Sequence, residues 1–376
     1  MATRELLRSR TTRWLVPAAA VAIIAASVGV NAVAANADPS LAPRTAAELL
    51  ASLAQAPSHP FTGTVSENAD LGIPALPGAA STSLSWQSLI SGSHTARVWY
   101  ASPSQVRLAL VGDLAESDVV RDGSDLWVWS SQDRTVSHTT LPAGSTTGHG
   151  ATPPTMPAFD PLTAATRALA AIDPSTSVTV DGTSRVAGRP VYELVLTPRA
   201  SASLIGQVRL AIDSETSVPL RVQVIARGAS SPAFETAFTS ITFSRPADSV
   251  FAFTPPAGTQ VTESALPSGS TKAPGVARTR PTTTGAKPTV VGTGWTMVVE
   301  IPDAPALLSG STSSKGSGSA AASTLMQAMS PVSGSFGTGQ LLQTALVSVL
   351  ILSDGRAFVG AVTPELLEQV AASTPR

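Results

Sequence analysis

Apolar and polar residues alternate along most of the chain between residues 60 and 253. In one such segment Leu220 and Val222 fall on one side, whereas Arg221 and Gln223 fall on the other. Successive side chains of a strand point to opposite faces, so this period of two predicts strands with one dry and one wet face. The predicted strands are 61–65, 83–90, 95–100, 106–111, 118–121, 125–130, 178–180, 191–196, 207–212, 220–226, 233–243 and 251–253.

Short turn signals separate these strands. Asp122-Gly123 is typical of a hairpin because both residues tolerate a positive φ, and Asp181-Gly182, 188–190 and Asp213-Ser214 mark further turns. Because no helix intervenes between most successive strands, we expect antiparallel pairing. The pattern therefore predicts a mainly β fold built on a curved antiparallel sheet.

Two short helices accompany the strands. Thr45 and Glu48 have the spacing of a capping box, and a stripe of leucines follows over 49–53. Asp160-Pro161 predicts a second helix that runs to Ile172, with Asp as its cap and Pro at its first position. We expect both helices to cover one face of the sheet.

Composition divides the remainder into further segments. We predict a β domain over 38–260, a linker rich in Pro, Thr and Gly over 261–289, and a small α+β domain over 290–376 with a Ser/Gly-rich loop at 309–323. In the last domain we expect a strand at 294–301, a hairpin of 341–352 with 356–362 around Asp354-Gly355, and a final helix from Pro364.

The first 37 residues have the pattern of an export signal. An uncharged apolar stretch covers 14–37, and Ala35 and Ala37 supply the small residues that signal peptidase needs. We favour cleavage after Ala37; the alternative is an uncleaved anchor, since a bilayer needs about 20 apolar residues. Either way we expect an extracytoplasmic protein, secreted or associated with the envelope near the membrane. The basic residues ahead of the stretch are Arg4, Arg8, Arg10 and Arg13.

Composition and motifs exclude several classes of function. The 24 basic and 25 acidic side chains leave no field to attract nucleic acid, and the absence of cysteine excludes disulfides and thiolate sites. No histidine pair has a metal-binding spacing, and no catalytic or phosphate-binding motif is present. We expect a non-enzymatic protein without metal or cofactor. The histidines are His59, His94, His138 and His149, and we interpret each as a surface or loop residue.

Tryptophans gather on the predicted strands of the first half. Trp127 and Trp129 are two residues apart and so face the same way, and Trp86 and Trp99 lie on other strands of that sheet. One interpretation is an ordinary core, because large aromatic side chains dominate cores. The other is a concave apolar cavity under the helices, since two short helices leave part of a long curled sheet uncovered.

Short motifs occur in a defined order between residues 45 and 261. They are 61–65 (FTGTV), 103–107 (PSQVR), 122–123 (DG) with 126–129 (LWVW), 188–194 (GRPVYEL), 208–213 with 219–222, 238–243 (FTSITF), 251–253 (FAF) and 255–258 (PPAG). This order resembles the LolA-type lipoprotein carriers and the related RseB/MucB family of sigma-factor regulatory proteins, particularly those of high-GC Gram-positive bacteria. The unit from Val290 resembles the second domain of RseB-like proteins in its position.

The resemblance implies a half-open β-barrel whose helical lid covers a hollow for acyl chains, and it implies that Arg107 holds the lid by a hydrogen bond. We therefore predict an extracytoplasmic carrier for a lipid or lipoprotein acyl chain. One alternative is an RseB-like regulator that binds a membrane anti-sigma factor, and another is a structural envelope protein. The predicted cavity residues are Trp86, Trp99, Trp127, Trp129, Leu108, Leu110, Tyr192 and Leu194.

Overall fold

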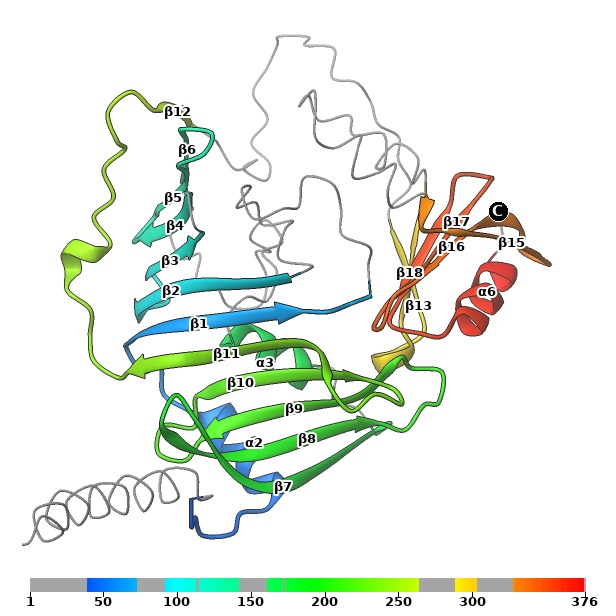
Figure 1. Ribbon diagram of the computed structural model, residues 1–376, viewed down its shortest axis with the longest axis horizontal. Coiled ribbons are helices and arrows are strands. Elements are labelled where there is room, and N and C mark those ends of the chain that lie inside the picture. The colour runs from blue at the N-terminus through cyan, green and yellow to red at the C-terminus, as the bar shows by residue number, and fades with distance from the viewer. Residues whose placement is uncertain are drawn as a thin grey trace, which may run out of the picture.

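A computed structural model describes residues 39–72, 92–112, 115–141, 161–170, 172, 174–263, 288–302 and 327–374 (Figure 1). The predicted export signal, the predicted strand 83–90 and the Ser/Gly-rich loop lie outside the described residues. Within the described part of the chain, no helix is long and apolar enough to cross a bilayer.

The larger sheet has twelve strands within the described residues, and it is curved and not closed (Figure 1). Neighbouring strands pair antiparallel, except that β12 runs parallel to β6 at one edge. The predicted mainly β fold on a curved antiparallel sheet is confirmed. In spatial order the strands are β12 (Gln260–Glu263), β6 (Thr135–Thr140), β5 (Asp125–Ser130), β4 (Glu116–Asp122), β3 (Gln105–Val111), β2 (Gly92–Ser102), β1 (Phe61–Ala69), β11 (Pro232–Thr242), β10 (Pro219–Ala226), β9 (Ile205–Asp213), β8 (Arg189–Pro198) and β7 (Thr176–Val186).

Helices α2 (Ala46–Gln55) and α3 (Pro161–Ala170) pack on one face of this sheet, which we call the inner face. Thr45 and Glu48 form the predicted capping box at the start of α2. Leu49 of α2 and Ala165 of α3 are buried in one cluster with residues of β8, β9 and β10. The helices therefore cover the β7–β11 half of the sheet.

A row of paired residues extends the inner face from β8 to β2. Directly opposite residues of antiparallel strands point to the same face. Because Leu194, Leu210 and Val222 pack with the helices, the residues that continue their row lie on the inner face too. In order the row is Leu194, Leu210, Val222, Thr236, Glu67 and His94.

Residues 244–259, which we call the strap, connect β11 to β12 across the opposite, outer face of β2–β5 (Figure 1). The strap contains a short 3-10 helix, η2 (Asp248–Val250), and its Phe251 is fully buried. The predicted strand 251–253 is therefore wrong: the apolar residues there anchor the strap instead of joining the sheet.

Some turn and strand predictions for this sheet need correction. Asp181-Gly182 is not a turn but a bulge inside β7, where Gly182 takes a φ of +80°. Strand β6 was not predicted, because among its residues only Val136 is a large apolar one. Strand β12 lies in the segment predicted as a linker, and all four of its residues are exposed.

The smaller sheet carries helix α6 (Pro364–Ser373), which begins at the predicted residue. The predicted strand 294–301 begins only at Val298, because residues Gly294–Thr296 form the 3-10 helix η3. The predicted strand 341–352 is two strands, separated by a turn in which Thr344 accepts hydrogen bonds. In spatial order the strands are β13 (Thr289–Val291), β14 (Val298–Ile301), β18 (Ala357–Gly360), β17 (Ser348–Leu352), β16 (Gly337–Gln343) and β15 (Ser330–Gly334).

The two sheets are joined by direct contacts. Trp295 packs into the buried cluster under α2 and α3, and its Nε1 donates to Thr176 Oγ1 at 2.7 Å. The backbone of Thr363 donates to Ala202, and that of Leu204 donates to Ala361. The smaller sheet thus completes the core of the larger one.

Candidate functional site

The predicted cavity residues divide between the two faces of the sheet. Trp99 is paired with Arg107, Arg107 with Val120, and Val120 with Trp127, so both tryptophans lie on one face. Leu108 and Leu110 alternate with Arg107 along β3 and therefore point to the opposite, inner face. Trp86 lies outside the described residues.

The tryptophans lie on the outer face, where the strap covers them. Trp129 is paired with Asp118, two residues from Val120, and so shares the face of Trp127, as predicted. The rings of Trp127 and Phe253 of the strap are 5.5 Å apart. A cavity under the helices cannot include these side chains, because the helices pack on the other face. Trp99, Trp127 and Trp129 are therefore not part of a cavity under the helices, and the prediction for Trp86 lies outside the described residues.

Arg107 connects the outer face to the strap. Its guanidinium donates to Asp118 and, at 3.4 Å, to the carbonyl of Val250, and it lies 5.4 Å from the centre of the Trp99 ring. None of these partners belongs to α2 or α3. The role that the resemblance implies for Arg107, a bond to a helical lid, is therefore replaced here by a bond to the strap.

Asp118 is a buried carboxylate with an incomplete set of partners. It is 3% exposed, and its Oδ1 accepts no hydrogen bond among the described residues. Burial raises the pKa of Asp118 from 3.8 to about 6, and the neighbouring Arg107 charge opposes this rise. The pair couples the stability of the outer face to pH.

His138 ties the edge strand β12 to the sheet. Its Nδ1 lies 2.9 Å from Glu263 and its Nε2 lies 2.9 Å from Asp125, while its ring stacks on Trp127 at 3.9 Å. Hydrogen bonds that the ring donates to Asp125 and Glu263 raise the pKa of His138, because both carboxylates favour the imidazolium. His138, expected to be a surface or loop residue, lies in strand β6, where it is 15% exposed and has three partners.

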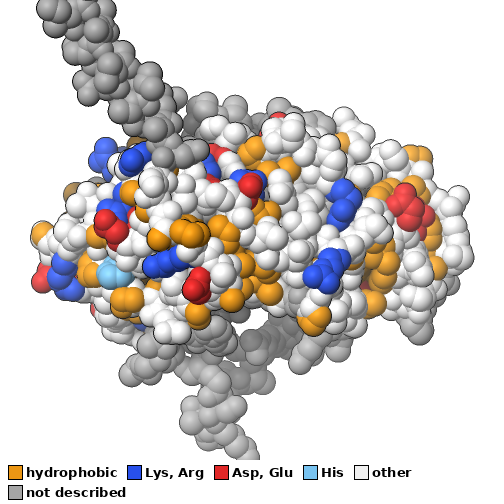
Figure 2. All heavy atoms as spheres, turned by 90° about the horizontal axis from the view of Figure 1, so that it is seen from below, with side chains coloured by type: hydrophobic (Ala, Val, Ile, Leu, Met, Phe, Trp, Pro, Cys, Tyr) orange, Lys and Arg blue, Asp and Glu red, His pale blue; other side chains and the backbone are white. Residues whose placement is uncertain are grey.

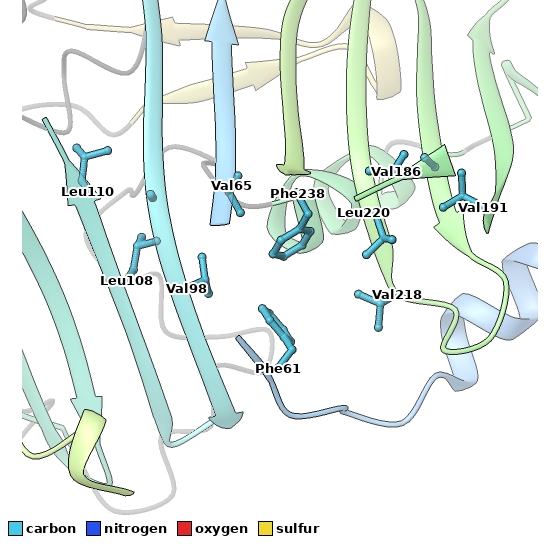
Figure 3. Close-up of a cluster of buried hydrophobic side chains, with 12 residues drawn as sticks. Phe61, Val65, Val98, Leu108, Leu110, Val186, Val191, Val218, Leu220 and Phe238 are labelled. Carbon is cyan, nitrogen blue, oxygen red and sulfur yellow. The ribbon is translucent and has the colours of Figure 1, made fainter. Parts of the chain in front are cut away.

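The inner face of β1–β5 carries a second apolar region, separate from the helix-covered one. Phe61 of β1 and Phe238 of β11 face each other there, with Val98, Leu108 and Leu110 on the neighbouring strands (Figure 3). No residue of α2 or α3 belongs to this buried cluster among the described residues.

A row of four apolar side chains extends this region toward the edge of the sheet. The pairing Val98–Leu108–Val119–Val128 crosses β2 to β5 without a polar residue. Val98 and Leu108 are buried, whereas Val119 and Val128 are only half-buried. We call these four residues the acyl row.

Tyr192 and Leu194 belong to the helix-covered region, where other side chains of the protein pack against them. Leu194 is fully buried in the cluster under α2 and α3. The Tyr192 hydroxyl donates to the carbonyl of Ala42 at 2.8 Å, and Arg44 lies over its ring. The structure thus places four of the predicted cavity residues on the inner face, but in two separate clusters.

The charged groups on the described surface do not form a metal site. No group of three or more His, Asp or Glu side chains in the described ranges could hold a metal ion. On the side seen in Figure 2, acidic and basic side chains are interspersed among uncharged ones. This distribution agrees with the near-zero formal charge of the chain.

Sequence reasoning missed the inner-face pair of the buried Glu67 with the half-buried His94. The signal was present: Phe61, Val65 and Ala69 fix the buried phase of β1, and Glu67 falls in that phase. It was not used because the predicted strand ended at residue 65.

Comparisons with known proteins find one matching protein family and several similar solved structures. Residues 81–263 match a family model described as a predicted periplasmic protein (DUF2092), and no curated protein matches the sequence. A chain in the solved structure of the Pseudomonas aeruginosa MucA/MucB complex is 20% identical to this chain. The match covers 87% of this chain and 96% of the solved one, with a TM-score of 0.43.

Two further solved structures are similar over a smaller part of this chain. A LolA superfamily protein from Nitrosomonas europaea is 12% identical and covers 56% of this chain and 99% of its own, with a TM-score of 0.23. A putative outer membrane lipoprotein-sorting protein domain from Vibrio parahaemolyticus is 9% identical, with coverages of 55% and 96% and a TM-score of 0.23. The chain is thus similar to MucB and to LolA-superfamily proteins, the two groups that its motifs resemble.

Proposed function

We propose that this chain is an extracytoplasmic binding protein for a lipid or lipoprotein acyl chain, which lies along the acyl row on the inner face. The observation that carries the proposal is the row itself: four paired apolar side chains, buried at Val98 and Leu108 and half-buried at Val119 and Val128. The periplasmic description of the matched family and the similarity to LolA-superfamily proteins support the same compartment and ligand class.

The apolar contact alone supplies enough free energy for useful affinity. Burial of a methylene group contributes about 0.8 kcal/mol, so a chain of about 12 to 16 carbons gains roughly 10 kcal/mol before entropic costs. The ligand therefore needs no catalytic group or metal from the protein.

Two substitutions that add bulk to the half-buried end of the row test the proposal. Val119→Trp and Val128→Trp should weaken uptake of a fluorescent fatty acid about tenfold or more, because each ring occupies space along the row. Val111→Trp is the matched control, since Val111 is 42% exposed and has the phase of the outer face. Native mass spectrometry of protein from its own host should show a co-purifying lipid; no lipid and no uptake by the unchanged protein would refute the proposal.

A second candidate function is a regulator that binds a membrane anti-sigma factor, as the RseB/MucB resemblance and the solved MucA/MucB complex suggest. The observation in its favour is a pair of exposed apolar side chains on the smaller unit, Val290 at 56% and Met297 at 45%. The double substitution Val290→Ser with Met297→Ser should then abolish binding of the extracytoplasmic segment of a host anti-sigma factor in calorimetry. Val261→Ser on β12, also exposed, is the control.

The two candidates separate cleanly in these assays. Loss of partner binding with normal lipid uptake would support the regulator, and the reverse would support the carrier alone. Failure of both binding assays would leave a structural envelope protein.

A further inference from the structure

Glu67 breaks the apolar pattern of the inner face. Strand β1 alternates strictly between buried and less buried residues, and its buried phase contains Phe61, Val65, Glu67 and Ala69. Glu67 is only 1% exposed, and it continues the row of Leu210 and Val222 that packs under the helices. A carboxylate at this place on a central strand costs stability unless its oxygens have partners.

One oxygen of Glu67 has a partner and the other has none. Oε2 lies 3.0 Å from His94 Nδ1, whereas Oε1 accepts no hydrogen bond among the described residues. Burial raises the pKa of Glu67, and the bond to His94 opposes that rise. The free oxygen is therefore a buried acceptor that is not satisfied within the described part of the protein.

The other buried carboxylates with a free oxygen have a stronger counter-charge. Asp118 is paired with Arg107, and Glu193 with Arg221. Both of these acids lie on the outer face. Asp118 is paired with Trp129, which lies there. Glu193 and Arg221 are both paired with Ala211, and Arg221 alternates with the inner-face Val222. Glu67 has only a histidine, which is charged only when protonated. Of these three acids, Glu67 is the one that lies on the inner face, and its Oε1 has no hydrogen-bond donor among the described residues.

The position of the pair suits the head of a ligand whose tail lies along the acyl row. Val65 and Ala96 occupy the next inner-face positions after Glu67 and His94, and Ala96 is paired with Leu110. Val98, the first residue of the acyl row, is four residues from His94 on β2, roughly 13 Å at 3.3 Å per residue. Apolar residues fill the interval between them.

Building on the proposed function, we propose that Glu67, oriented by His94, binds the polar head of the acyl ligand by accepting a hydrogen bond at Oε1. The site then selects amphiphiles whose head carries a donor, such as a glycerol hydroxyl, an amide N–H or an amine. It disfavours free carboxylate and phosphate heads, because an acceptor facing an acceptor is repulsive.

Competition between amphiphiles of equal chain length tests this assignment. In the unchanged protein, monopalmitoylglycerol should displace a bound fluorescent fatty acid at a concentration about tenfold lower than palmitate requires. A hydrogen bond to a charged group contributes a difference of this size. In Glu67→Gln the ratio should fall to within about twofold, because the amide can also donate to a carboxylate. Glu235→Gln is the control, since Glu235 is a carboxylate of β11 that already accepts from Gln223.

A second variant, His94→Asn, keeps the test meaningful should Glu67→Gln lower stability; it should reduce the ratio, chiefly by weakening the binding of monopalmitoylglycerol. Equal binding of both ligands by the unchanged protein, or the same preference in Glu67→Gln, would overturn the role of Glu67 and leave the acyl site standing. If neither amphiphile binds the unchanged protein, the proposed function fails, and the assignment of Glu67 fails with it.

Discussion

The two halves of the inner face show what one strand pattern can encode. Over β7–β11, side chains of α2 and α3 pack against Leu194, Leu210 and Val222, and Trp295 from the smaller unit packs into the same cluster. Over β1–β3, inner-face side chains form a second buried cluster that reaches residues of β7–β11, and none of its described members belongs to a helix. The alternation of the strands specifies a dry face in both halves, and the placement of the helices decides which part of that face packs against helical side chains.

The outer face differs between the halves in a corresponding way. Over β8–β10 it is held by ion pairs, such as Arg189 with Asp213 and Arg221 with Glu193. Over β2–β6 it is covered by the strap, and Arg107 is the charged residue that bonds to it. The strap thus contacts the aromatic ring of Trp127 on the outer face and leaves Trp99, Trp127 and Trp129 half-buried.

The largest expected effect is on stability in the helix-covered half. Leu210→Ala should lower the free energy of unfolding by about 2 to 5 kcal/mol, because Leu210 is fully buried and its removal leaves a cavity under the helices. Val128→Ala, in the other half, should cost less than about 1 kcal/mol because Val128 is half-buried. Urea denaturation measures both; equal losses would remove the distinction between the two regions.

Removal of Arg107 should have a smaller effect that depends on pH. Arg107→Ala leaves Asp118 buried without its counter-charge and should cost about 2 kcal/mol at pH 7.5. The pKa of Asp118 is raised to about 6, so the unchanged protein gains stability from its protonated form at low pH and loses this gain as pH rises from about 4 through 6.

In the variant that pKa rises further, so the loss should be smaller at pH 5 than at pH 7.5. Denaturation at the two pH values gives the comparison, with Arg245→Ala as the control because both partners of that surface ion pair are exposed. A loss independent of pH would contradict the account of the pair.

The smallest effect concerns the end of the strap. His138→Gln should cost about 0.5 kcal/mol, because Glu263 is 72% exposed and such pairs contribute little. The pKa of His138 is raised, so this contribution is present below its ordinary value and disappears as pH rises through the raised one. Hydrogen exchange should accelerate in β12 and leave β8 unchanged; unchanged exchange in β12 would show that His138 does not hold it.

Local sequence signals predicted the elements whose cause is local. The capping box of Thr45 and Glu48 and the Asp122-Gly123 turn need only neighbouring residues, and both are present. Asp181-Gly182 misled because a bulge within a strand uses the same positive φ as a turn. The segment 251–253 misled because an apolar side chain can be buried by a strap as well as by a strand.

The candidate site depended on information that no local pattern contains. The sequence predicts that Trp127 and Trp129 share a face, but the identity of that face follows from strand register and from the position of the helices. Glu67 could be assigned to the buried phase of β1 only after the strand was known to extend to Ala69. Whether its Oε1 finds a donor depends on strands that are distant in the sequence.

Photo-crosslinking with a fatty acid that carries a diazirine on its chain tests the central claim most directly. The account predicts adducts on inner-face residues of β2–β5, with the acyl row strongly labelled in the unchanged protein and weakly labelled in Val128→Trp. Adducts confined to β7–β10 or to the strap, or labelling that Val128→Trp leaves unchanged, would contradict an acyl site on this half of the sheet.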